Sequence, residues 1–324
     1  MLMNLVEAVN SAMDAEMALD TSVVVFGEDA GFEGGVFRAT AGLQKKYGKD
    51  RCFDSILAES AIVGSAIGMA INGLRPVAEI QFEGFLFPAL NQIYTHAARM
   101  RNRTRGKYTV PLVVRMPYGG GVKALEHHSE APEALLAHVP GLKVVIPSTP
   151  YDAKGLLIAA IRDPDPVIFF EPKRIYRAFR QEVPEEAYTL PIGKARILQA
   201  GTQLTVVTYG AMVRDVQEAV KALEAEGFSI EVIDLRTIVP YDRETVIASV
   251  KKTGRFAVVH EAVTSFGVGA ELIAAVNEDA FLHLEAPPLR IAAPDIIVPL
   301  PRGEHLYQPN AAAITAGLRS VLTF

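Results

Sequence analysis

The sequence has only one cysteine, no long apolar run and no block of basic residues. Cys52 alone can build neither an intrachain disulfide nor a multi-cysteine metal site, so we expect a reducing, cytoplasmic environment. No apolar stretch approaches the roughly 20 residues that span a bilayer, and the start of the chain, with Glu7, does not resemble a secretory signal. The apolar residues are therefore expected in a core or a subunit interface, not in a membrane.

Basic charge is too scattered for a nucleic-acid partner. The net charge is -5, and the longest basic runs are Lys45-Lys46 and Lys251-Lys252. A P-loop is excluded because no Gly-Lys-Ser/Thr occurs. Gly267-Val268-Gly269 resembles the start of a dinucleotide fingerprint, but Leu272 stands where the third glycine is needed, so nucleotide binding is not expected there.

What the sequence does contain is an alternation of short β-branched runs and helical patterns, typical of α/β folds with a parallel sheet. At 324 residues the chain is long enough for two domains. In the first half we expect strands at 23–26, 76–82, 112–115, 142–146 and 167–170, and helices at 61–73, 88–100, 133–138 and 152–162. Right-handed crossovers would place these helices on both faces of the sheet.

The segment 180–193 interrupts the alternation with two prolines and three acidic residues, which indicates an interdomain linker. A second, smaller α/β domain follows. Its expected strands are 204–208, 230–235 and 256–260, and its expected helices are 213–226, 243–250 and 311–322. Asn310 is placed to cap the last helix.

Glu59 is the first candidate for chemistry, because it lies between an expected strand end and the helix near Ala61. Ligands gather outside the carboxyl ends of strands in open α/β sheets. An acidic residue in the first turn of a helix is equally explained by the helix dipole. Position alone leaves these two interpretations open.

His128 is the second candidate. It follows Gly119-Gly120-Gly121, whose backbone can approach a ligand closely. The adjacent pair His127-His128 lacks a third metal ligand at a recognisable spacing, so proton transfer is the better hypothesis. Phe82, Phe85 and Phe87 are more often core than cofactor contacts, and Cys52 is expected to be a small buried residue.

Several ordered stretches together resemble one family, the beta subunit of the thiamine-diphosphate-dependent decarboxylating component of 2-oxo acid dehydrogenase complexes. The similarity runs from about Leu5 to the C-terminus. Its motifs are Gly27-Glu28-Asp29, Gly34-Gly35-Val36-Phe37-Arg38, Leu57-Ala58-Glu59, the stretch 76–82, Gly119-Gly120-Gly121, His128-Ser129, the stretch 152–157, Asp234-Leu235-Arg236-Thr237 and Leu284-Glu285-Ala286-Pro287.

The resemblance implies a pyrimidine-binding domain over 1–185 and a transketolase C-terminal-like domain over 186–324. It also implies an alpha subunit, an α2β2 heterotetramer and a dihydrolipoyl acyltransferase core as partners. In this family the alpha subunit holds the cofactor's diphosphate and its magnesium through a Gly-Asp-Gly motif, which this chain lacks.

The family's site residues match positions of this sequence. The resemblance implies that Glu59 hydrogen-bonds the pyrimidine ring, that Leu57 and Phe85 line its pocket, and that His128 assists acyl transfer to a lipoyl arm. A structural potassium ion in some relatives corresponds to Leu112, Ala160, Ile161, Asp163 and Asp165.

One feature differs from the family pattern, and others favour different substrates within the family. The proline that usually follows Asp-Thr is replaced here, where Ser55-Ile56 follows Asp54, which loosens a φ constraint beside Glu59. The stretches 129–134 and 169–173 favour a branched-chain 2-oxo acid, whereas Phe85 favours pyruvate; acetoin dehydrogenase is a further alternative. A non-catalytic assembly subunit and a self-sufficient transketolase-type enzyme are the competing classes.

Overall fold

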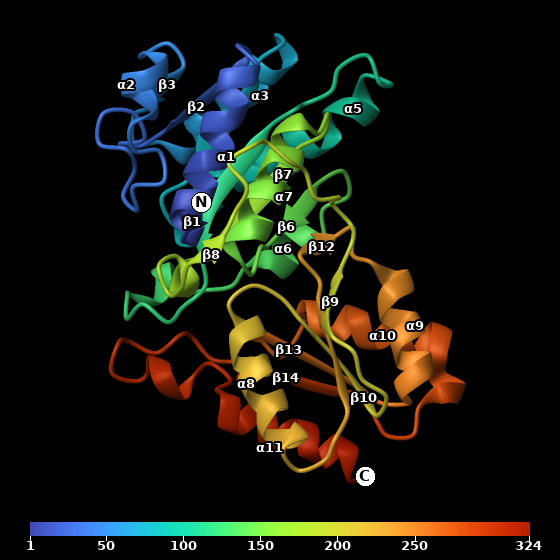
Figure 1. The fold of residues 1–324 in the computed structure, drawn as a ribbon. Helices are drawn as coiled ribbons and strands as arrows, with labels where there is room; N and C mark the ends of the chain where they lie inside the picture. Colours follow the sequence, from blue (N-terminus) through green and yellow to red (C-terminus); the bar gives the residue numbers. More distant parts are fainter. The chain divides into compact units, whose positions relative to one another are not determined.

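The computed structural model describes residues 1–324, which form two compact units (Figure 1). The first comprises Met1–Tyr118 and Leu135–Ile192, and the second comprises Gly119–Ala134 and Gly193–Phe324. The α/β architecture expected from the sequence is confirmed. The units differ from the expected division at residue 185 in two ways: the change occurs after Ile192, and the segment that carries His128 belongs to the second unit.

A parallel sheet forms the centre of the first unit, with strands in the order β6-β7-β5-β4-β2-β3. Most of its strand residues are buried, as expected for a parallel sheet covered on both faces. The strands are β2 (Val23–Gly27), β3 (Cys52–Asp54), β4 (Arg75–Glu79), β5 (Val113–Tyr118), β6 (Lys143–Val145) and β7 (Val167–Pro172).

Helices cover both faces of this sheet because its right-handed crossovers run in opposite directions along the strand order. The helix α1 (Leu5–Leu19) packs against α7 (Pro150–Arg162), and α3 (Glu59–Ile71) packs against α4 (Leu86–Asn91) (Figure 1). The helix expected at 88–100 is instead a succession of short turns: α4, a π-helical turn Gln92–His96, a 3-10 turn Ala97–Arg99 and α5 (Met100–Arg103). The remaining helices are α2 (Leu43–Tyr47) and α6 (Glu133–Ala137).

The N-terminal helix α1 was not among the expected elements, yet its start is well defined. Asn4 accepts a hydrogen bond from the Glu7 backbone (3.0 Å), and the Glu7 side chain accepts one from the Asn4 backbone (2.9 Å). This reciprocal capping box satisfies two donors that the first helical turn leaves unpaired. Buried apolar residues on one side of α1 then pack against α7.

The expected linker is bound to the first unit. Its β8 (Gln181–Glu182) pairs with β1 (Leu2–Met3), and the Lys154 ammonium donates to the carbonyls of Pro184 (2.6 Å) and Glu185 (2.8 Å). Tyr188 stacks on Tyr151 with ring centroids 4.8 Å apart. These contacts hold the segment against α7. The acidic, proline-containing linker is therefore an ordered connection.

The second unit contains a mixed sheet in the order β14-β13-β10-β11-β9. Only β9 is antiparallel to its neighbour, which is common for an edge strand. The strands are β9 (Arg196–Gln199), β10 (Leu204–Thr208), β11 (Ile230–Asp234), β13 (Phe256–Val263) and β14 (Leu289–Ala293); a further short strand is β12 (Thr237–Val239).

Two helix pairs cover this second sheet. One pair is α8 (Met212–Glu224) with α11 (Ala311–Leu322), and the other is α9 (Arg243–Thr253) with α10 (Val268–Ala280). Leu204, Val206 and Leu223 belong to the core under the first pair. The expected cap of the last helix is confirmed, because Asn310 accepts a hydrogen bond from the Ala313 backbone (2.9 Å).

The glycines at the start of α10 fit a neighbouring ring. A Cβ at Gly267 would lie 2.9 Å from His260 Cε1, and one at Gly269 would lie 2.8 Å from its Nε2. Burial lowers the pKa of His260 to about 4, so the ring that fills this space is neutral at pH 7. Side-chain packing therefore explains the Gly-Val-Gly pattern without a nucleotide.

Two further expectations concern the chain as a whole. Cys52 is buried, and burial raises the pKa of its thiol to about 11, as expected for a packing residue and not a reactive one. None of the helices combines the length and the apolar character that crossing a membrane requires.

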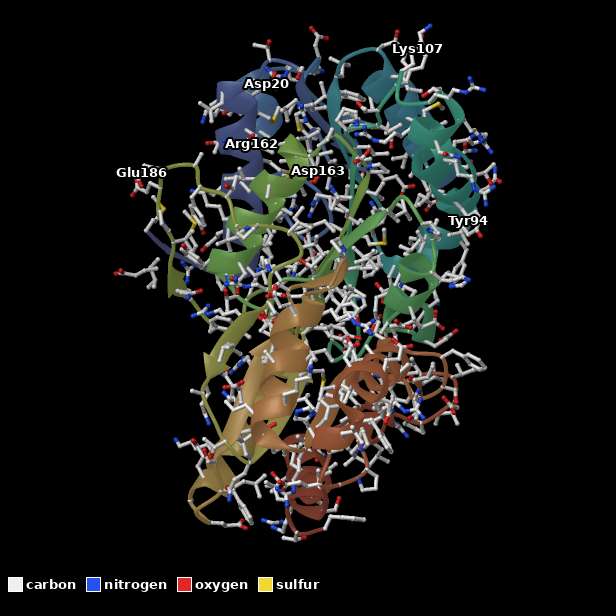
Figure 2. The ribbon with its side chains drawn as sticks, turned by 90° about the vertical axis from the view of Figure 1, so that its right-hand side faces the viewer. Asp20, Tyr94, Lys107, Arg162, Asp163 and Glu186 are labelled. Atoms are coloured by element: carbon white, nitrogen blue, oxygen red, sulfur yellow. The ribbon has the colours of Figure 1, made fainter.

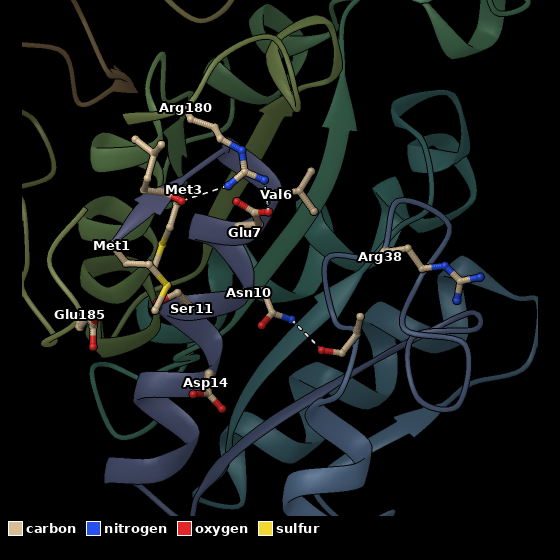
Figure 3. Close-up of a pocket in the computed structure, with 12 residues that line it drawn as sticks. Met1, Met3, Val6, Glu7, Asn10, Ser11, Asp14, Arg38, Arg180 and Glu185 are labelled. Carbon is tan, nitrogen blue, oxygen red and sulfur yellow. Dashed lines mark hydrogen bonds and ion pairs between the residues drawn. The ribbon is translucent and has the colours of Figure 1, made fainter. Parts of the chain in front are cut away.

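An open cavity of about 580 Å³ lies beside α1 (Figure 3). Arg180 crosses it to donate to Glu7 (2.7 Å), and Asn10 donates to the Ala41 carbonyl (3.1 Å). None of the site residues expected from the sequence lines this cavity. It is an open feature of the first unit.

Candidate functional site

Glu59 is the first residue of α3 and follows β3 by a short turn. Its side chain is buried, with 8% exposure, although it lies at the end of a helix. The helix starts without a side-chain cap: Ala58 precedes it, and the Ala58 carbonyl accepts from the backbones of Ala61 and Ile62 (2.9 Å each). A buried carboxylate at the carboxyl end of a strand is where an α/β sheet binds ligands.

The turn before Glu59 is held by hydrogen bonds, although it lacks the family's proline. The Ser55 backbone donates to the Gly27 carbonyl (2.9 Å), which ties the turn to the end of β2. The Asp54 carboxylate accepts from the backbones of Gly31 (2.7 Å) and Phe32 (3.3 and 3.2 Å to its two oxygens). These hydrogen bonds hold the backbone of the turn in place. In the family pattern expected from the sequence, the fixed φ of a proline would supply this constraint.

Glu28 is a further candidate for this site, which sequence reasoning named only within the motif Gly27-Glu28-Asp29. It directly follows β2, the strand between β3 and β4, and it is also buried. Burial and, next, the charge of Glu59 raise the pKa of the Glu28 carboxyl, and its Oε1 has no hydrogen-bond partner. The available signal was an acidic residue immediately after a buried strand, the same signal that marked Glu59.

A buried arginine organises the neighbouring strand ends. Arg115 on β5 donates to both oxygens of Glu171 on β7 (2.7 and 2.8 Å) and also pairs with Glu79 on β4. Tyr176 donates to the same Glu171 carboxylate (2.6 Å). Burial raises the pKa of Glu79, which makes the paired cation necessary for its charged form.

The two expected pocket residues lie in different environments. Leu57 is 81% exposed and stands two residues before the buried Glu59. Phe85 ends the turn Glu83–Phe85 and is half-buried, edge-on to Phe82 with ring centroids 6.2 Å apart. The turn is held by a fully buried ion pair between Glu83 and Lys173 (2.5 Å).

His128 lies in the second unit, on a short turn Glu126–His128. Its ring contacts the His127 ring at a 51° tilt with centroids 4.0 Å apart, and its Nδ1 lies 3.2 Å from the His127 carbonyl oxygen. Ser129 is buried and donates to the Leu125 carbonyl (3.1 Å). The histidine is half-buried, a position that allows a proton to reach solvent or a substrate.

The expected potassium ligands are already occupied by groups of the chain (Asp163 in Figure 2). The Lys143 ammonium contacts both Asp163 oxygens (2.7 and 2.5 Å), and Arg101 donates to Asp165 (2.6 Å). Arg75 donates to the Ile161 carbonyl (2.9 Å). The carbonyls of Leu112 and Ala160 accept from backbone N–H groups (2.9 and 3.2 Å). As arranged, these residues do not fit a potassium ion.

Two family models match the chain. Residues 2–178 match the pyrimidine-binding domain of transketolase, and residues 193–314 match the transketolase C-terminal domain. Pyruvate dehydrogenase E1 component subunit beta of Acholeplasma laidlawii is 65% identical over 320 residues, which is 99% of this chain and 98% of that protein. The chain belongs to the pyruvate dehydrogenase E1 beta-subunit family.

Other members are similar along their whole length. The E1 beta subunit of Mycoplasma genitalium is 57% identical and that of Bacillus subtilis is 52% identical, with at least 96% of each chain covered. Among solved structures, a split-gene transketolase described as an inactive beta4 tetramer has a TM-score of 0.81 at 22% identity and covers 99% of both chains. This last similarity supports the fold. The E1 beta-subunit assignment rests on the sequence relatives.

In this E1 beta subunit, Glu28→Gln should increase the stability of the chain at neutral pH. A carboxyl whose pKa is raised by folding destabilises the folded state above its ordinary pKa, and the penalty grows as pH rises toward the raised value. The variant removes that ionisation. Thermal unfolding from pH 4 to pH 8 should therefore show the variant gaining over the wild type as pH rises.

The matched control is Glu33→Gln, which makes the same change at an exposed carboxylate of the same unit. It should leave the pH profile close to that of the wild type. A Glu28→Gln chain that is less stable than the wild type at pH 8 would contradict a raised Glu28 pKa.

Proposed function

We propose that this chain supplies half of a thiamine-diphosphate site in the decarboxylating component of a 2-oxo acid dehydrogenase complex, and that an alpha subunit supplies the other half. The observation that carries the proposal is Glu59, a buried carboxylate at the start of α3, two residues after the exposed Leu57. A buried acceptor with an exposed apolar side chain two residues earlier suits a flat heteroaromatic ring with one polar edge. The chain has no Gly-Asp-Gly motif, which supports a partner that holds the diphosphate and its magnesium.

The chain's own residues have separate roles in this proposal. Glu59 holds a hydrogen bond to the pyrimidine ring, and Leu57 and Phe85 line the ring. When bound, thiamine diphosphate supplies the electron sink that decarboxylation of a 2-oxo acid requires. Burial and the charge of Glu59 raise the pKa of Glu28, so Glu28 helps to keep a proton available beside Glu59.

His128 has a later role. Its half-buried imidazole has one ring nitrogen that can accept a proton and one that can donate a proton. We assign it to the transfer of the acyl group to a lipoyl arm of the dihydrolipoyl acyltransferase core, where a sulfur must be protonated or deprotonated. Its loop and Glu59 lie in different units of the chain.

Pyruvate is the proposed substrate. The relatives reported above carry pyruvate in their names at 52–65% identity, and Phe85 also favours it. The preference for a branched-chain acid expected from 129–134 and 169–173 gains no support from these relatives. Acetoin is not favoured by any contact in the structure.

The competing classes are less well supported. An assembly subunit needs no buried carboxylate at position 59, whereas Glu28 and Glu59 are buried close enough for their charges to interact. A self-sufficient enzyme needs its own diphosphate site. Tight binding of thiamine diphosphate by this chain alone, measured by calorimetry, would support the self-sufficient class over ours.

Glu59→Gln should leave the complex with the alpha subunit assembled and should lower decarboxylation by roughly 100-fold or more. An amide fills the same volume but cannot hold the proton that the ring nitrogen shares with a carboxyl group. Gel filtration reports assembly, and reduction of an artificial electron acceptor reports decarboxylation. Glu33→Gln serves as the control, and near-normal turnover by Glu59→Gln would remove the catalytic assignment.

The substrate is tested by co-expressing the chain with its alpha partner. We expect kcat/KM for pyruvate to exceed that for 3-methyl-2-oxobutanoate by roughly tenfold or more. The branched acid carries an isopropyl group that must fit a pocket shaped for the single methyl group of pyruvate. Equal values, or a preference for the branched acid, would overturn the choice of pyruvate.

A further inference from the structure

The three glycines before His128 approach two carboxylates of the second unit closely. The Gly121 backbone donates to Glu304 Oε1 (2.6 Å), and the Lys123 backbone donates to Glu304 Oε2 (2.8 Å). The Gly120 backbone donates to Glu261 Oε2 (3.3 Å). One carboxylate thus binds two backbone N–H groups of one loop with both of its oxygens.

Glu304 is well placed for this contact. It begins a short 3-10 turn, Glu304–Leu306, and is 5% exposed. Hydrogen bonds to an ionised acceptor are stronger than neutral ones, and burial protects them from competing water. The other end of the loop is closed by the Gly119 backbone, which donates to the Glu130 carbonyl (3.1 Å).

The contact explains why this stretch is glycine. Gly119 and Gly121 have φ of +78° and +86°. A Cβ at Gly119 would lie 2.4 Å from Glu261 Oε1, and one at Gly120 would lie 3.0 Å from Glu304 Oε1. Side chains here would displace the carboxylates, so the glycines serve the attachment of the loop.

We propose that Glu304 is a positioning residue that holds the loop 119–130, and with it His128, in the geometry needed for acyl transfer. The inference rests on the role proposed above for His128. Glu304 binds the loop at Gly121 and Lys123, seven and five residues before the histidine. Without it, the loop would keep its closure at Gly119 but lose its attachment in the middle.

Glu304→Ala tests the attachment directly. Lys123 is exposed and lies in the attached segment, so trypsin can cut after it only when the loop opens locally. Mass spectrometry of the purified chain should show cleavage at Lys123 several-fold faster in the variant than in the wild type. Glu304→Gln keeps one acceptor oxygen and should give an intermediate rate.

The same variants are then assayed in the complex with the alpha subunit. Glu304→Ala should slow acyl transfer to a lipoyl domain by roughly tenfold or more, because a small displacement of a catalytic group is costly. Decarboxylation with an artificial acceptor should stay near the wild-type rate. Glu244→Ala, which removes a 90% exposed carboxylate from the same unit, is the control for both assays.

The outcomes separate the two proposals. The positioning role is overturned if Glu304→Ala changes neither trypsin cleavage nor acyl transfer. It is also overturned if the variant slows decarboxylation and acyl transfer in parallel. If His128→Ala slows both reactions equally, the role of His128 fails, and the trypsin rates still decide whether Glu304 holds the loop.

A second inference comes from the occupied potassium ligands. We infer that the Lys143 ammonium and the Arg75 guanidinium take the place of a potassium ion in this chain. Lys143 binds both oxygens of Asp163 at the end of α7, and Arg75 binds the Ile161 carbonyl in the last turn of the same helix. A third cation among them would be repelled by both.

The effect of different salts on thermal stability tests whether these side chains replace a potassium ion. Thermal unfolding of the wild-type chain should have the same midpoint in potassium, sodium and choline chloride at equal ionic strength. Lys143→Met frees the Asp163 carboxylate, and its midpoint in potassium chloride should exceed that in choline chloride by roughly 2–4 °C. Lys49→Met, at an exposed position of the same unit, should not respond.

Either of two results would overturn the inference. One is a wild-type midpoint raised by potassium but not by sodium. The other is a Lys143→Met chain that remains indifferent to potassium.

Discussion

The ion pairs of the Arg115 guanidinium, in the middle of the first sheet, are the interaction on which the candidate site depends. Arg115 is 1% exposed and joins carboxylates of the strands on both sides, Glu79 on β4 and Glu171 on β7. Buried charges without partners are strongly destabilising, so these strands must end in register for the three groups to be paired. The turn with Phe85 follows β4, and the glycine loop follows β5. One ion-pair cluster thereby fixes where these segments begin.

The same edge of the sheet concentrates negative charge where stability alone would not favour it. Glu28 lies beside Glu59 at the ends of adjacent segments, and burial raises its pKa. Unlike Glu79, Glu28 has no cation that lowers its pKa, so burial and the neighbouring carboxylates favour its protonated form. A buried carboxyl with a raised pKa at the carboxyl ends of the strands is a candidate for moving protons. Arg115 neutralises Glu79 and Glu171, whereas no cation neutralises Glu28.

Much of the fold was predictable because periodicity reflects burial directly. The run Val23–Phe26 is a buried strand, and Asn310 caps the final helix as its position predicted. The helix α1 was missed, although Asn4 and Glu7 form a capping box that the sequence displays. The pattern of 88–100 predicts one helix, but where this stretch packs against α3 it consists of short turns. Local patterns specify an element's type, whereas its continuity depends on what it packs against.

The sequence by itself determined the α/β class and the family and made Glu59 a candidate, because these follow from ordered motifs and from strand-helix alternation. It could not reveal that Glu28 interacts with Glu59, that Glu304 binds the glycine loop 183 residues away, or that Lys143 occupies Asp163. Each of these depends on the distance between side chains that are remote in the chain. Only the folded sheets bring such groups together, and only burial makes their charges interact strongly enough to decide what each can bind.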